Sequence, residues 1–357
     1  MMATQSPVTP EQFKKLEEQL GTLMRVTTTR YPIDQTPKEV IWTLNKAKLW
    51  RYVPALPAEK RHRVPLIFSF ALMNRPSILD LRPGNSFVEY MLAHGYDLYL
   101  LDWGVPGYED RHFNMDEYVG DLMPRAVRKM KSAAGSEEFS MLGWCIGAIL
   151  ATAYAALYPD SGLRNLLLLT APLDFTNREA NGFTRWVNEK FFDVDRVVET
   201  FGLIPPEMIQ YGAKALKPVE NYIGNYLRLW DNLDNPEVVE SWHAMNTWVN
   251  DNIPMTGGFF KQLIQELFRE NKLMKGTLKV RGERVDVGRI RANLLNVIAM
   301  ADHITPPCES ESIMNRVSSE DKELFRLQGG HIGIMTGSSA RKITWPHIEN
   351  WLRQRSD

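Results

Sequence analysis

The 357-residue chain has little cysteine and no excess of charge of either sign. Its two cysteines, Cys145 and Cys308, lie in no Cys-x-x-Cys spacing, and no His-Glu-x-x-His spacing occurs, so neither a disulfide scaffold nor a zinc site is expected. The 42 basic and 43 acidic residues give a formal net charge of -1, without the basic stripe typical of nucleic-acid binding. We therefore expect reduced thiols, no metal and no nucleic-acid partner.

The first residues also lack the features of a secretory leader, because no basic segment is followed by an apolar run. A cytoplasmic protein is therefore expected. One stretch imitates a membrane span: residues 139–159 form 21 consecutive positions without charge. A Gly-Trp-Cys-Ile-Gly turn interrupts it, so we interpret it as a buried strand, a turn and a buried helix, and expect no transmembrane segment.

Strand-type and helix-type patterns alternate in two parts of the chain. Helical patterns fall at 86–94, 115–134, 148–158 and 341–355, and apolar strand-type runs fall at 64–70, 97–101, 139–142, 165–170, 294–300 and 324–327. Such alternation predicts a mostly parallel sheet covered by helices on both faces.

Two segments depart from this alternation. Residues 1–45 are polar and punctuated by prolines, and we expect a helix, a turn and a helix there. Residues 176–288 are dense in aromatic side chains and are expected to form a mainly helical insertion. The predicted organisation is therefore an N-terminal helical segment (1–45), an α/β core (46–175 and 289–357) and a cap subdomain (176–288).

The turn Gly143-Trp-Cys-Ile-Gly147 carries the first chemical signal, because it has the form Gly-x-nucleophile-x-Gly between a strand and a helix. This pattern predicts the α/β-hydrolase fold, with Cys145 on a strained turn at the N-terminus of a helix that favours its thiolate form. The backbone N–H of Ile146 should face a developing oxyanion, and a second donor is expected at Leu72 or Met73. A buried, inert cysteine is the alternative for Cys145.

The catalytic acid should follow a late strand of the sheet. Asp302 directly follows the apolar run at 294–300, and we favour it for this position. Asp174, after the strand at 165–170, is the competing candidate. Asp102 precedes the nucleophile and is interpreted as a turn residue, and Cys308 as structural or incidental.

The catalytic base should follow the last strand. His331 lies in Gly329-Gly-His-Ile-Gly333, whose glycines allow a loop to hold the imidazole over the nucleophile. His303, next to Asp302, is the rival for this role, and we expect it and Trp144 to contact the substrate. The remaining histidines have no strand-end context: His62, His94, His112, His243 and His347.

A cysteine nucleophile favours acyl transfer from a thioester. A thiolate that attacks a thioester forms another thioester, so the exchange is close to thermoneutral and the acyl-enzyme stays activated for an alcohol acceptor. Two other functions stay open: a thioesterase or esterase on the same scaffold, and a non-catalytic granule-binding or partner-binding protein.

Several segments together resemble the catalytic subunit of poly(3-hydroxyalkanoate) synthases, in the short two-component form called class III or IV. The likeness runs from about residue 30 onward and is carried by Phe70-Ala-Leu-Met-Asn-Arg-Pro76, Leu79-Asp-Leu81, Tyr99-Leu-Leu-Asp-Trp-Gly104, Leu142-Gly-Trp-Cys-Ile-Gly147, Thr170-Ala-Pro-Leu-Asp-Phe175, Asp302-His303 and Gly329-Gly-His-Ile-Gly333. The family usually has a second glycine after the nucleophile motif, where this chain has Ala148. Because alanine is small and favours helix, we expect the turn to be kept.

The resemblance implies polymerisation of (R)-3-hydroxyacyl-CoA, with 3-hydroxybutyryl-CoA as the expected substrate. CoA would be the leaving group, and no cofactor is implied. By this likeness Cys145 carries the growing chain, His331 activates it, Asp302 assists elongation, and the cap covers the active site. The resemblance also implies a second, smaller subunit and a location at polyester granules; near-zero charge and an aromatic cap fit self-association, for example as a homodimer.

Overall fold

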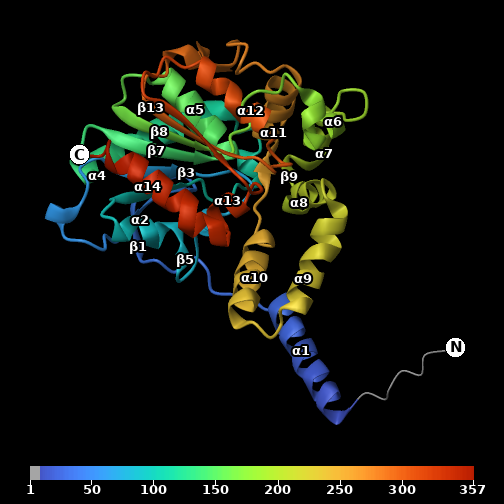
Figure 1. The fold of residues 1–357 in the computed structure, drawn as a ribbon. Coiled ribbons are helices and arrows are strands. Elements are labelled where there is room, and N and C mark those ends of the chain that lie inside the picture. The colour runs from blue at the N-terminus through green and yellow to red at the C-terminus, as the bar shows by residue number, and fades with distance from the viewer. Residues whose placement is uncertain (1–8) are drawn as a thin grey trace.

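The computed structural model describes residues 9–357, and its centre is one eight-stranded sheet (Figure 1). The strand order is β1-β2-β6-β3-β7-β8-β13-β14. The bounds are β1 Lys38–Leu44, β2 Ala47–Tyr52, β3 Leu66–Ser69, β6 Leu98–Asp102, β7 Phe139–Trp144, β8 Leu163–Leu169, β13 Asn293–Ala299 and β14 Lys322–Leu327. The strands from β6 to β14 pair in parallel, so their carboxyl ends lie at one edge of the sheet.

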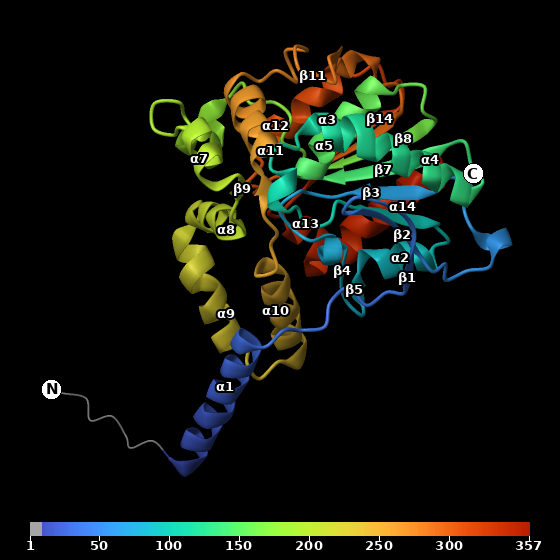
Figure 2. The same ribbon diagram turned by 180° about the vertical axis from the view of Figure 1, so that it is seen from behind.

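Helices cover both faces of the sheet, which explains the nearly continuous apolar strands. Leu166–Leu169 in β8, for example, have no exposed surface. One face carries α4 (Met123–Ala134) and α5 (Ile146–Leu157), and the other carries α2 (Phe87–Ala93) and α14 (Trp345–Arg353) (Figures 1 and 2). The predicted α/β-hydrolase architecture is therefore confirmed.

The helix predicted at 115–134 is continuous but irregular. It begins as α3 (Met115–Glu117), passes through a π-helical segment, η4 (Tyr118–Leu122), and continues as α4. The uncharged stretch at 139–159 contains strand β7 and helix α5, as predicted. Within residues 9–357, no helix combines the length and the apolarity that a membrane crossing requires.

The expected N-terminal pair of helices is wrong in its second half. Residues 10–28 form helix α1 (Pro10–Thr28), but the following residues form the antiparallel hairpin of β1 and β2. Leu44 pairs with Ala47 across a two-residue turn in which Asn45 has φ 51°. A two-residue turn with a left-handed asparagine and flanking β-branched and aromatic residues favours a hairpin, and that signal outweighs the proline punctuation. Residues 1–8 of the predicted segment lie outside the described residues.

The predicted cap, residues 176–288, is mainly helical. Its helices are α6 Gly182–Trp186, α7 Val194–Phe201, α8 Pro206–Ala215, η6 Glu220–Gly224, α9 Asn225–Asp231, α10 Pro236–Val249, α11 Gly257–Gln262 and η7 Leu263–Arg269. The short strands are β9 Leu203–Ile204, β10 Met255–Thr256, β11 Lys279–Val280 and β12 Glu283–Arg284. The assignment of this segment as a separate subdomain stays a prediction.

Helix α1 packs against the cap. Val26, which has no exposed surface, forms a small cluster with Leu229 of α9 and Val239 of α10. His243 Nε2 of α10 lies 3.0 Å from the carbonyl oxygen of Thr29, just after α1. The two views show α1 directed away from the sheet beside α9 and α10 (Figures 1 and 2).

Candidate active site

Cys145 occupies the sharp turn between β7 and α5. Its backbone has φ 55° and ψ -122°, a strained conformation for a residue with a side chain, and it is the N-cap of α5. A Cβ on Gly147 would lie 2.1 Å from the carbonyl oxygen of Ser69, and one on Gly143 would lie 2.6 Å from Cα of Ala148. Both flanking glycines are therefore required by close backbone approach, which is the physical basis of the motif.

His331 and Asp302 form a buried pair. Nδ1 of His331 donates to Oδ2 of Asp302 over 2.7 Å, and the other carboxylate oxygen, Oδ1, accepts from the backbone N–H groups of Ile304 at 2.8 Å and Thr305 at 2.9 Å. The Asp302 side chain has no exposed surface. This loop fixes the carboxylate, which in turn fixes the imidazole orientation and leaves Nε2 free to face the cavity.

The electrostatics of the site join Cys145 to this pair. Burial lowers the pKa of His331, but the negative charges of Cys145 and Asp302, and hydrogen bonds with both, raise it to about 10. The imidazole of His331 is therefore coupled electrostatically to Cys145 as well as to Asp302. The helix N-terminus at Cys145 favours the same negative charge. Cys145, His331 and Asp302, predicted as a triad, thus lie together.

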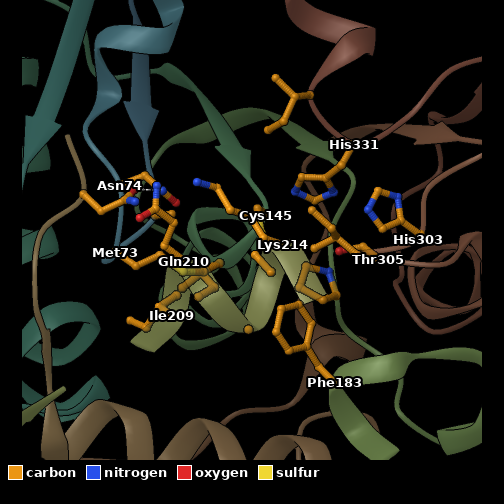
Figure 3. A pocket seen from close by; sticks show the side chains of 18 of the residues that line it. Met73, Asn74, Cys145, Phe183, Ile209, Gln210, Lys214, His303, Thr305 and His331 are labelled. Carbon is orange, nitrogen blue, oxygen red and sulfur yellow. Dashed lines mark hydrogen bonds between the residues drawn. The ribbon is translucent and has the colours of Figure 1, made fainter. Parts of the chain in front are cut away.

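A cavity of about 840 Å³ lies above these residues (Figure 3). Cys145 and His331 line it from the core, and side chains of α6, α8, α9 and η7 line it from the cap. The cap residues therefore form most of the wall that faces the nucleophile. A cavity of this size falls within the range of small-molecule binding sites.

The expected substrate contacts also reach the cavity. Trp144 and His303 both line it, and Figure 3 shows His303 close to His331. Burial is the main cause that lowers the pKa of His303, assisted by the positive charge of Lys217, so this imidazole is neutral near pH 7. Within the described residues neither Nδ1 of His303 nor Nε1 of Trp144 has a hydrogen-bond partner. Both atoms are buried, so these two residues reach the cavity through other parts of their rings.

The predicted oxyanion donors occupy suitable positions. Ile146 is the first residue of α5, so its N–H belongs to the unpaired first turn of that helix. Met73 lines the cavity, and its carbonyl oxygen accepts from the N–H of Ile253 at the start of a cap loop. Leu72, the other candidate, is buried. The roles of Ile146 and Met73 stay predictions.

The competing acids have other partners. Asp174 accepts from Thr176 and from Nδ2 of Asn271, at 2.6 Å and 2.8 Å, and these bonds offset its burial to give a lowered pKa. Asp102 accepts from the N–H of Gly104 at 2.9 Å, as expected for a turn residue. Cys308 is an exposed free thiol.

Two residues at the site were missed by sequence reasoning. Nδ2 of Asn181, at the start of α6 in the cap, donates to Oε1 of Glu309 at 2.8 Å and to the carbonyl oxygen of Ile304 at 3.0 Å. Glu309 is 1% exposed, and burial raises its pKa to about 8. Asn181 is recognisable as a helix N-cap in the sequence, but nothing local distinguishes Glu309 from a surface glutamate.

Comparisons with known proteins identify the fold and the family of the chain. The α/β hydrolase fold family model matches residues 82–338. The poly(3-hydroxyalkanoate) polymerase subunit PhaC of Allochromatium vinosum is 33% identical over 90% of this chain and 89% of its own length. The chain belongs to this PhaC family. The PhaC subunit of Haloferax mediterranei is 34% identical over 93% of this chain, which spans 66% of that relative's length.

Solved structures support the fold alone. A thermophilic esterase from Thermogutta terrifontis matches with a TM-score of 0.54 and 14% identity, over 90% of this chain and 100% of that chain. A monoacylglycerol lipase from Paleococcus ferrophilus matches with a TM-score of 0.51 and 16% identity, over 83% and 96%. PhaC membership, by contrast, extends the likeness to both the sheet and the cap.

Proposed function

We propose that Cys145 attacks the thioester of an (R)-3-hydroxyacyl-CoA, with 3-hydroxybutyryl-CoA the expected substrate, and carries the growing polyester. The chain is a poly(3-hydroxyalkanoate) polymerase subunit by family, and therefore an acyltransferase. One observation supports the assignment of the nucleophile above all others. Cys145 projects from a glycine-flanked turn into the same cavity as His331, which is held by buried Asp302.

In the first half-reaction, Nε2 of His331 takes the proton of Cys145. The thiolate sulfur bonds to the acyl carbon, the carbon–sulfur bond to CoA breaks, and the CoA thiolate takes the proton back from His331. The N–H groups of Ile146 and Met73 are proposed to stabilise the tetrahedral oxyanion. The product is a thioester on Cys145, as activated as the one consumed.

In elongation, the 3-hydroxyl of the next substrate attacks the acyl group on Cys145. His331 takes the hydroxyl proton, an ester bond forms, and the bond to the sulfur of Cys145 breaks. Asp302 assists because its negative charge stabilises the imidazolium that forms. The freed thiolate then attacks the CoA thioester of the extended chain, the carbon–sulfur bond to CoA breaks, and the CoA thiolate takes the proton from His331. Each cycle therefore returns the site to its starting charge.

The macromolecular contacts of the chain are also part of the proposal. The relatives are named as polymerase subunits, which supports a second, smaller subunit beside this one. An insoluble polyester product supports a cytoplasmic location at the granule surface, to which exposed apolar side chains such as Phe13, Met24 and Phe191 would adsorb. A homodimer is a further arrangement that these exposed side chains would allow.

The decisive experiment measures two products at once. The full chain, alone and with a candidate small subunit, is incubated with 3-hydroxybutyryl-CoA, and free CoA and free 3-hydroxybutyrate are quantified. CoA release without matching free acid supports polymerisation, whereas equimolar acid would identify a thioesterase.

The two cysteines provide a test variant and its matched control. Cys145→Ala should abolish CoA release, while Cys308→Ala, which alters an exposed free thiol, should retain it. Absence of CoA release from the unmodified chain in both settings would rule out either catalytic function.

A further inference from the structure

The two cap walls of the cavity differ in chemistry. The wall formed by α6, α11 and η7 is apolar: Phe183, Trp186, Phe260, Leu263, Ile264 and Phe268. The polar wall, formed by α8, η6 and α9, contributes the polar and charged side chains beside the apolar Met208, Ile209 and Ala213 of α8: Gln210, Lys214, Glu220, Asn221, Asn225 and Arg228. A ligand that spans this cavity therefore meets an apolar surface on one side and amide and charged groups on the other.

Within the polar wall, Lys214 differs from its neighbour Arg228. The guanidinium of Arg228 is paired with the carboxylate of Glu220 and also bonds to Asn225. No carboxylate of residues 9–357 forms a salt bridge with Lys214, and its Nζ lies 5.9 Å from the centroid of the Tyr222 ring. Lys214 is half-buried, and this burial lowers its pKa, so its ammonium group is partly desolvated without a salt-bridge partner among the described residues.

A desolvated cation in a binding cavity favours an anionic ligand. Figure 3 shows Lys214 among the side chains that line the cavity. Of the parts of an acyl-CoA, the hydroxyacyl group and the pantetheine arm are neutral, and only the phosphates are anionic. The amide side chains next to Lys214 match the hydrogen-bonding groups of the neutral arm.

We propose that Lys214 binds a phosphate group of the CoA substrate, so that the polar wall of the cap holds the CoA portion and the apolar wall faces the acyl chain. This inference rests on the proposed function, because it assigns the substrate's leaving group to one side of the same cavity. Lys214 is thus a specificity-determining residue, and it acts on binding rather than on the reacting carbonyl.

The test compares two thioesters of 3-hydroxybutyrate, one with CoA and one with N-acetylcysteamine, which lacks phosphates. Lys214→Met should raise KM for the CoA thioester by about tenfold or more, as expected for a lost hydrogen bond to a charged group, with kcat within about twofold. KM for the N-acetylcysteamine thioester should not change. Lys214→Arg should keep most of the affinity, and Lys190→Met, an exposed cap residue outside the cavity, serves as the matched control.

Equal losses on both thioesters would overturn the inference, because they would mean that Lys214 acts on the reacting centre or on folding. An unchanged KM for the CoA thioester would overturn it as well. Direct binding of free CoA and of pantetheine separates this outcome from failure of the proposed function. An inactive chain that loses about tenfold in CoA affinity, but none in pantetheine affinity, on Lys214→Met would still support the phosphate contact.

Discussion

Asn181 of the cap and Glu309 of the core are joined by a hydrogen bond of 2.8 Å between Nδ2 and Oε1. The same Nδ2 group of Asn181 donates to the carbonyl oxygen of Ile304, and the N–H of Ile304 donates to Oδ1 of Asp302. A continuous set of contacts therefore runs from the first turn of α6 to the carboxylate that orients His331. Asn181 is in this sense a positioning residue, and its contacts connect the placement of the cap with the geometry of the catalytic loop.

Asn181→Asp should reduce kcat for CoA release by roughly tenfold, because it removes the Nδ2 donor that holds Ile304 and Glu309. The aspartate keeps the side-chain oxygen that caps α6, where Oδ1 accepts from the N–H of Phe183 at 2.8 Å, so helix capping is preserved. Steady-state kinetics on 3-hydroxybutyryl-CoA measures the effect. Asn177→Asp, on the same loop, is the control, and wild-type kcat in Asn181→Asp would contradict the positioning role.

Glu309→Gln should flatten the dependence of stability on pH. Burial raises the pKa of Glu309 from its ordinary 4.5 to about 8, so the folded chain keeps this proton while the unfolded chain loses it. The free energy of unfolding that comes from keeping Glu309 neutral in the folded chain is fully present below about pH 4.5. It is lost as pH rises toward 8, at roughly 1.4 kcal/mol per pH unit. The charged groups that face Glu309, namely Asp302, Asp174 and His331, are present in both proteins.

Urea unfolding of both proteins at pH 5 and pH 8 measures this difference. The variant should gain free energy of unfolding relative to the parent between the two pH values. An equal change with pH in parent and variant would show that Glu309 ionises normally in the folded chain.

Asp302→Asn should lower the rate of CoA release by about 10³–10⁴-fold while the fold is kept. The asparagine retains an oxygen for the N–H groups of Ile304 and Thr305, but it presents no negative charge to the imidazole. Single-turnover CoA release with circular dichroism as a folding check measures the result. Asp174→Asn, whose carboxylate is bound to Thr176 and Asn271, should stay within about threefold of the parent rate; the reverse ranking would assign the acid to Asp174.

Gly147→Ala should mainly reduce activity, whereas Ala148→Gly at the adjacent position should mainly reduce stability. The added methyl at Gly147 meets the Ser69 carbonyl, so the turn must shift and activity should fall at least 100-fold. Ala148 is fully buried in α5, and glycine there should cost about 1 kcal/mol of stability with little loss of activity. Thermal unfolding and CoA release, measured on both variants, separate the two effects. A gain in activity with Ala148→Gly would mean that the alanine restrains this turn.

The parts of the site that depend on residues close together in the sequence could be predicted. The strand, turn and helix around Cys145 could be predicted because tight backbone approach admits only glycine at 143 and 147. Asp302 and His331 followed from strand-end positions, since parallel strands bring their carboxyl ends to one edge. The hairpin at 38–52 was missed because its turn signal, a left-handed Asn45, is weaker than the common Asn-Gly pair.

Residues defined by distant partners could not be predicted in this way. Asn181 and Glu309 are 128 positions apart, and only the packing of the cap onto the core brings them together. Lys214 could not be predicted either, because its lack of a salt-bridge partner depends on where the carboxylates lie in the folded chain. The sequence shows that these residues are polar, but it does not show which of them are buried or left without a partner in the folded chain.

The packing of α1 on α9 and α10 has a practical consequence. Val26, Leu229 and Val239 form a small apolar cluster away from the catalytic sheet, so α1 would move together with α9 and α10 in any displacement of the cap. A fluorophore attached to an exposed position of α1, such as Lys14, would report that displacement without entering the cavity. Helix α1 is therefore a labelling position outside the cavity from which a displacement of the cap could be measured.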